Sequence, residues 1–157
     1  MILWRIAADT RKYAADDLSG GGAAKSPGRW NDAGEAVVCA AATISLSVLE
    51  TAAHLDDTGF PINRYLLELN VPDDVWVLHE AFDPAALPVT WAAIPAGNAS
   101  VRIGSAWLAS RRSLILLVPS VIVPEERVAL INPDHPECTR IVARVVRRFE
   151  YNRLIRR

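Results

Sequence analysis

The 157-residue sequence predicts one α+β domain, residues 1–157, built on a mixed β-sheet. Apolar residues make up 51% of the chain, and a chain of this length buries about 70% of its unfolded surface, so a full core is expected. Short apolar or alternating runs, typical of strands, are interleaved with a few helical patterns. Because too few helical crossovers separate these runs for a doubly wound parallel sheet, the pattern favours the α+β class.

Strand patterns recur from the N-terminus to the end of the chain. In the first of them, Trp4 and Arg5 face opposite sides of the strand. The segment 64–71 alternates in the manner of a half-buried strand, whereas 113–118 is apolar along most of its length. The expected strands are 2–6, 35–40, 64–71, 75–78, 113–118, 128–131 and 145–151.

Helical spacing predicts two main helices. One begins at a cap supplied by Thr43 or Ser45 and continues to about Asp57. The other covers 100–110, where Gly104 lowers the stability of the helix by about 1 kcal/mol relative to alanine. The remaining segments are expected to be a flexible Gly/Ala loop over 19–24, a proline-broken irregular stretch over 82–95 with a possible helical turn, and a short helix over 137–143.

Charge is divided unevenly along the chain. The total is −1, but residues 1–100 carry a net charge of −7 and residues 101–157 a net charge of +6. The two parts are expected either to attract each other within the fold or to leave a basic region for an acidic partner or a phosphorylated ligand. Nucleic-acid binding is not favoured, because the overall charge is not positive and no basic–aromatic motif is present.

Several classes of protein are disfavoured by what the sequence lacks. No apolar run reaches the ~18 residues that span a bilayer, and no signal-peptide pattern opens the chain, so we expect a cytoplasmic protein without membrane contact. Cys39 and Cys138 fit a reducing compartment, and Cys39 is expected to be a small core residue of its strand. Without CxxC or HExxH spacing, no metal site is expected.

The segment from Gly28 to Glu50 carries the strongest indication of a functional site. Arg29 lies in a loop bounded by glycines, a buried strand follows, and Glu50 lies on the next helix, where Ser47 and His54 share its face. Arg29 is thus placed to hold a phosphate-bearing ligand and Glu50 to stabilise developing positive charge. The alternative is a surface arginine and a solvated helix glutamate.

Six short segments, in this order, resemble the RES domain family, which is named for an arginine, a glutamate and a serine. The resemblance covers nearly the whole chain. The segments are Leu3-Trp4-Arg5, Gly28-Arg29-Trp30-Asn31 with Gly34, Leu49-Glu50, Val118-Pro119-Ser120, Asn132-Pro133-Asp134-His135-Pro136 and Tyr151-Asn152-Arg153-Leu154.

The resemblance implies a split mixed sheet like that of ADP-ribosyltransferase toxins. RES proteins are toxins of bacterial toxin–antitoxin pairs, and they arrest growth unless an Xre-type helix-turn-helix antitoxin binds them. A hetero-oligomer with such an antitoxin is therefore expected. RES proteins use NAD+ as a substrate, without a prosthetic group: some hydrolyse or phosphorolyse it, and others ADP-ribosylate a protein.

Matched position by position, the family arginine, glutamate and serine correspond to Arg29, Glu50 and Ser120, and an early arginine corresponds to Arg5. The implied reaction breaks the nicotinamide–ribose bond through an oxocarbenium-like transition state, which Glu50 is expected to stabilise. Arg29 and Arg5 are expected to bind the pyrophosphate. Ser120 is expected to hydrogen-bond the nicotinamide amide or the ribose, with a turn hydroxyl that satisfies local backbone as its alternative.

Two positions depart from the family pattern. The strand before Glu50 usually carries a tyrosine eleven residues ahead of the glutamate, and Cys39 stands there. A ring at that place would stack on nicotinamide, so Trp30 is the candidate to replace it, with a core position as its alternative. Asn152 stands near the place of an acid in the closing segment.

The expected function thus falls into one of two classes. The first is a toxin that degrades NAD+ as a glycohydrolase or phosphorylase, with water or phosphate as the acceptor of ADP-ribose and transfer to a protein as the alternative. The second is a non-catalytic partner-binding domain on the same scaffold. His54 and His135 are candidate acid–base groups, but His135 lies between two turn prolines and favours a structural role. No GxGxxG or P-loop is present, so NAD+ would not be held in the manner of a Rossmann fold.

Overall fold

The structure is a computed structural model that describes residues 1–54 and 62–151. Within these residues a seven-stranded sheet has the order β4-β5-β6-β2-β1-β3-β7. Its strands are β1 (Ile2–Ala8), β2 (Val38–Ala41), β3 (Arg64–Asn70), β4 (Glu80–Ala81), β5 (Ile115–Pro119), β6 (Arg127–Ile131) and β7 (Val142–Phe149). Neighbouring strands are antiparallel except for β4 and β5, which are parallel, so the sheet is mixed and the α+β prediction is confirmed.

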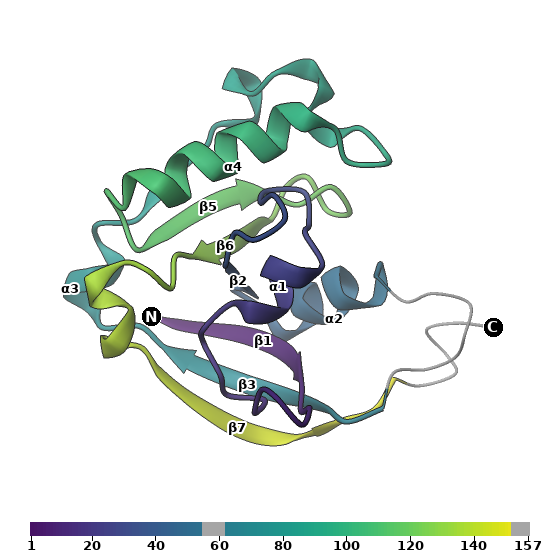
Figure 1. The fold of residues 1–157 in the computed structure, drawn as a ribbon, viewed down its shortest axis with the longest axis vertical. Helices are drawn as coiled ribbons and strands as arrows, with labels where there is room; N and C mark the ends of the chain where they lie inside the picture. Colours follow the sequence, from purple (N-terminus) through teal and green to yellow (C-terminus); the bar gives the residue numbers. More distant parts are fainter. Residues whose placement is uncertain (55–61, 152–157) are drawn as a thin grey trace.

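Short helices surround this sheet. They are α1 (Gly21–Lys25), α2 (Ile44–Ala52), α3 (Asp73–Trp76) and α4 (Asn98–Ser110), with 3₁₀ turns η1 (Pro84–Ala86), η2 (Val89–Ala92) and η3 (Pro136–Arg140). Figure 1 shows α4 running along β5 at one end of the molecule and β7 at the opposite end, with α1 and α2 between them.

The sheet divides where β1 meets β2. Strand β1 pairs with β3 along its whole length, from Ile2 to Ala8, but pairs with β2 only at Trp4 and Ala41. On the β5–β6 side, alternate strand residues pack against Trp107 of α4 and Trp91 of η2. On the β1–β3 side, α2 packs against a separate cluster of strand residues. The two halves of the sheet therefore have different helical cover, while one apolar cluster that includes Leu3 of β1 and Val38 of β2 continues across the junction.

The helix that carries Glu50 begins as the sequence predicts. Thr43 is the N-cap of α2, and its Oγ1 accepts a hydrogen bond from the Leu46 backbone N–H at 3.1 Å. The helix ends at Ala52, and the predicted extension to Asp57 reaches residues outside those the structure describes. The predicted departure at Asn152 also lies outside them.

Other predicted elements were wrong in type. The segment 75–78 is not a strand, since α3 begins after Pro72 with Asp73 and Asp74 in its first turn, where carboxylates favour a helix N-terminus. The segment 19–24 is not a loop, because α1 forms there and the Asn31 side chain bonds the backbone carbonyl of Ala23 at 3.0 Å. The segment 137–143 divides between η3 and the start of β7.

In the fold, arginines of the basic part of the chain form ion pairs with carboxylates of the acidic part. Three arginines of the basic part pair with carboxylates of the acidic part: Arg112 with Glu80 at 2.8 Å, Arg140 with Asp74 at 2.8 Å and Arg144 with Glu68 at 3.0 Å. These pairs are largely exposed, so each adds little stability. They do satisfy part of the attraction that the sequence predicts between the two parts.

Gly104 allows α4 to lie directly on the loop that carries Arg29. A Cβ at this position would lie 1.8 Å from the Trp30 backbone oxygen, a contact that only a backbone shift can relieve. We therefore expect Gly104→Ala to lower the melting temperature or the soluble yield markedly, although alanine is the better helix former. The control is Gly22→Ala in α1, whose Cβ would meet nothing within 4 Å. Equal thermal melting of the two variants would contradict this packing.

Candidate active site

A cavity of about 550 Å³ lies where β1 and β2 separate. Strands β1 and β2, helix α2, the loop after α1 and the segment after β5 contribute its walls. The side chains that the sequence singles out all line it: Arg5, Arg29, Trp30, Cys39, Glu50 and Ser120. The fold thus brings together residues that are more than 100 positions apart in the sequence, from Arg5 to Ser120.

Glu50 is held by a buried serine. The Ser120 hydroxyl donates a hydrogen bond of 2.5 Å to Oε1 of Glu50. The same Oγ accepts hydrogen bonds from the backbone N–H groups of Ile122 at 3.1 Å and Val123 at 3.0 Å. Since both lone pairs are occupied, the serine proton is directed at the carboxylate. Ser120 therefore satisfies the local turn, as its alternative predicts, and it also orients Glu50, which the sequence does not indicate. Its hydrogen bond to nicotinamide or ribose stays a prediction.

Arg29 is fixed by backbone carbonyls, which leaves half of its guanidinium available. Its Nη1 donates to the carbonyl oxygens of Trp91 at 2.7 Å and Ala93 at 2.8 Å. Both hydrogens of Nη1 are thereby used. Within the described residues, Nε and Nη2 have no partner, and these two atoms form the fork that binds an oxyanion bidentately. Burial lowers the pKa of the Arg29 guanidinium and Glu50 raises it, so the two charges influence each other within one cavity.

The loop that carries Arg29 is rigid for identifiable reasons. Asn31 is 2% exposed, and its Oδ1 accepts from the Gly28 N–H at 2.9 Å while its Nδ2 donates to the Glu35 carbonyl at 2.9 Å. The Glu35 carboxylate in turn accepts from Ser105 of α4 at 2.6 Å. In the sequence, Asn31 is part of the segment around Arg29 and Glu35 begins the predicted strand 35–40. Nothing in the local pattern indicates that they brace the loop.

Arg5 adds a second cation to the cavity wall. Its side chain is half-buried on β1, and it makes no hydrogen bond within residues 1–54 and 62–151; Nη1 is completely shielded from solvent. Burial lowers the pKa of Arg5, while Cys39 and Asp17 raise it. A shielded guanidinium nitrogen without a partner is energetically unfavourable. Because Arg5 also lines the cavity, its positive charge can attract an anion bound there.

Cys39 is not the core residue that the sequence predicts. It lies on β2 with its side chain open to the cavity and without a disulfide. The prediction fails because the Cys39 side chain faces the cavity and not a packed apolar layer. Burial raises the pKa of the thiol, Arg5 lowers it and Glu50 raises it. A raised pKa disfavours the thiolate, which is the nucleophilic form of cysteine.

Trp30 is both a core residue and part of the cavity wall, which are the two alternatives that the sequence leaves open. It is 7% exposed and belongs to the cluster beneath α4, where its ring stacks on Trp91 with 6.2 Å between the ring centroids. It also contributes to the cavity wall. Since one face is occupied by Trp91, a ligand meets only a limited part of the ring.

Of the two candidate histidines, His54 lines the cavity and His135 does not. His54 lies just beyond the end of α2, where it is exposed. His135 caps η3, where its Nδ1 accepts from the Glu137 N–H at 3.2 Å, so its predicted structural role is confirmed. Ser47 and Thr51 of α2 also line the cavity, and Ser47 was noted in the sequence only as sharing a face with Glu50.

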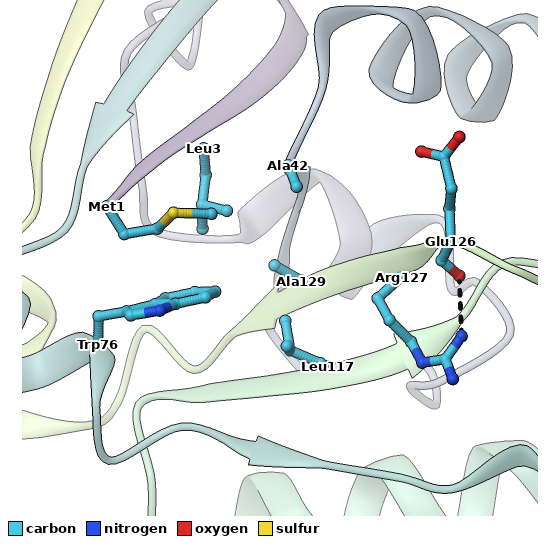
Figure 2. A pocket seen from close by; sticks show the side chains of 8 residues that line it. All are labelled: Met1, Leu3, Ala42, Trp76, Leu117, Glu126, Arg127 and Ala129. Carbon is cyan, nitrogen blue, oxygen red and sulfur yellow. Dashed lines mark hydrogen bonds between the residues drawn. The ribbon is translucent and has the colours of Figure 1, made fainter.

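A second cavity of about 280 Å³ lies elsewhere on the sheet. Figure 2 shows its mainly apolar lining, which includes Met1, Trp76 and Leu117, and the Arg127 side chain turned to the backbone oxygen of Glu126. None of the candidate site residues lines this cavity. The larger cavity is therefore the candidate active site.

Two kinds of feature are absent from the described part of the chain. No group of three or more His, Cys, Asp or Glu side chains is placed there to hold a metal ion. No helix among the described residues has the length and apolar character required to cross a membrane.

Comparison with known proteins gives the family. The RES domain model matches residues 2–153. A Sphingobium sp. (strain YBL2) protein named Prs ADP-ribosylating toxin is 54% identical over 155 residues, covering 98% of this chain and 96% of that protein. Proteins named Toxin Res are 38% identical in Yersinia enterocolitica, covering 86% of each chain, and 40% identical in Pseudomonas putida, covering 87% of this chain and 88% of that protein. The chain therefore belongs to the RES domain family.

Proposed function

We propose that the protein is a toxin that cleaves NAD+ between nicotinamide and ribose and transfers the ADP-ribosyl group to a protein. The observation that carries this proposal is the Glu50 carboxylate, oriented by Ser120 in a cavity that also holds the free fork of Arg29. This arrangement combines an anion for a cationic transition state with cations for a diphosphate. Rigid, pre-oriented groups of this kind are the main source of electrostatic catalysis.

The two arginines suit the diphosphate of NAD+. Arg29 offers Nε and Nη2 in a fixed orientation, because Nη1 is bound to two carbonyl oxygens. Arg5 contributes a charge with no partner in the described residues. Arginine binds phosphate oxygens in pairs and stays charged even where burial lowers its pKa.

The Glu50 carboxylate can stabilise the charge that develops when the nicotinamide–ribose bond breaks. When the bond between C1′ of the ribose and N1 of nicotinamide breaks, its electron pair leaves with nicotinamide, which departs as a neutral molecule. Positive charge then develops on the ribose, as in glycoside hydrolysis, and Glu50 stabilises it. The nucleophilic atom of the acceptor bonds to C1′ and releases its proton. Because nicotinamide needs no proton to leave, the site requires no general acid for this step.

The relative from Sphingobium favours a protein as the acceptor. Its name states ADP-ribosylation, and 54% identity over nearly the full length of both chains supports a common reaction. Water and inorganic phosphate are the competing acceptors, and both are small enough to enter a cavity of about 550 Å³.

The test uses purified full-length chain and NAD+ labelled in its adenosine half. We expect nicotinamide release, with the label transferred to a protein when a bacterial extract freed of nucleotides is added. Label recovered only as free ADP-ribose, or only as its phosphate ester when phosphate is present, would replace protein transfer with hydrolysis or phosphorolysis. If no nicotinamide is released under any of these conditions, the enzymatic proposal fails and a non-catalytic binding role replaces it.

We also propose that an Xre-type helix-turn-helix antitoxin controls this activity. An enzyme that consumes NAD+ needs an inhibitor in the cell that makes it, and an acidic segment of such a partner can bind Arg5 and Arg29 as a diphosphate would. We expect co-expression with the neighbouring gene product to relieve growth arrest and the purified complex to release no nicotinamide. A complex as active as the free chain would contradict this.

A further inference from the structure

Ser47 is a mostly buried residue that lines the candidate active site. It lies on α2 one turn before Glu50, is 5% exposed and lines the same cavity. Its side chain makes no hydrogen bond with any residue that the structure describes, although its own backbone is fully engaged: its N–H donates to Thr43 at 3.2 Å and its carbonyl accepts from the Thr51 hydroxyl at 2.5 Å.

The Ser47 hydroxyl is open to the cavity. Although the residue as a whole is 5% exposed, its Oγ is not among the fully shielded side-chain atoms of the described residues that lack a partner. In a helix, serine commonly bonds the carbonyl four residues earlier. Ser47 does not do so in the described structure, so its hydroxyl remains available to a molecule in the cavity.

We propose that Ser47 is a substrate-binding residue that hydrogen-bonds the nicotinamide riboside half of NAD+. The inference rests on the proposed function and adds a residue to it. Residues three apart on a helix lie on one side, so Ser47 and Glu50 face the same part of the ligand. Since Glu50 acts at the ribose, the ligand atoms near Ser47 belong to the ribose or to the adjoining carboxamide. A hydroxyl both donates and accepts, which suits either group.

The test compares Ser47→Ala with Ser45→Ala, an exposed serine in the same helix. We expect kcat/KM for nicotinamide release to fall about three- to tenfold in Ser47→Ala, the effect of one lost neutral hydrogen bond. Ser45→Ala should match the wild type. The melting temperature of ligand-free Ser47→Ala should be unchanged or higher, because the variant loses no hydrogen bond within the protein. A structural role for Ser47 would instead lower it.

Product binding identifies the atom that Ser47 contacts. Weaker binding of nicotinamide to Ser47→Ala assigns the carboxamide, and weaker binding of ADP-ribose assigns the ribose; either result supports the proposal. Unchanged kinetics and unchanged affinity for both products, measured on a wild type that releases nicotinamide, would overturn the role of Ser47 alone. A wild type that releases no nicotinamide would overturn the proposed function together with this inference.

Discussion

The Glu50→Gln variant is expected to release nicotinamide from NAD+ at least about 10²-fold more slowly than the wild type, which is the scale of losing one pre-oriented electrostatic group. Glutamine keeps the size of the side chain and has an amide oxygen that can accept a hydrogen bond from the Ser120 hydroxyl. This bond would replace the 2.5 Å hydrogen bond to Oε1 of Glu50. What is lost is the negative charge beside the ribose. The loss should therefore appear in kcat, with little change in folding.

The matched control for that variant is Glu125→Gln, an exposed carboxylate in the segment that follows Ser120. It changes the net charge by the same amount and should retain wild-type activity and melting temperature. Wild-type turnover by Glu50→Gln would remove Glu50 from the chemistry. A large fall in the melting temperature of Glu50→Gln would show that the carboxylate is mainly a structural partner of Ser120.

Arg29→Lys is expected to lower kcat/KM for NAD+ by about 10- to 100-fold, the cost of losing a charge-assisted bidentate interaction. Lysine preserves the charge but has no planar fork, and it cannot both bind the carbonyl oxygens of Trp91 and Ala93 and reach a phosphate with two parallel donors. The effect should fall mainly on KM, because the phosphates are bound in the ground state as well as in the transition state.

Arg102→Lys provides the control for this change. Arg102 is exposed on α4, away from the cavity, and its substitution should leave the kinetics unchanged. A wild-type KM in Arg29→Lys would show that charge alone is enough at this position. Equal losses in Arg29→Lys and Arg102→Lys would indicate a general effect of removing arginine.

The sequence predicts much of the fold because its strongest signals are local. The Thr43 cap and the alternating strand 64–71 are read from neighbouring residues, and both are present in the structure. The segment 75–78 was misread because its short apolar run has no period that separates a strand from a helix. The acidic pair Asp73 and Asp74 after a proline was the local signal for α3 that the run of apolar residues concealed.

The geometry of the candidate site is harder to predict from the sequence, because its contacts join residues that are far apart in the chain. The hydrogen bond from Ser120 to Glu50 spans 70 residues, and Arg29 is held by carbonyl oxygens 62 and 64 residues away, which no side-chain pattern encodes. The sequence places Cys39 in the core because strand periodicity does not reveal which side chains of β2 border a cavity. Family resemblance supplied the site residues, and the structure supplies how they are held.

The structure of the Glu50→Gln variant crystallised with NAD+ tests the central claim most directly. The variant should bind NAD+ without consuming it. We expect the diphosphate on Nε and Nη2 of Arg29, with the nicotinamide riboside half beside residues 47 and 50. NAD+ bound outside this cavity, or a cavity that stays empty at NAD+ concentrations that saturate the wild type, would contradict the account.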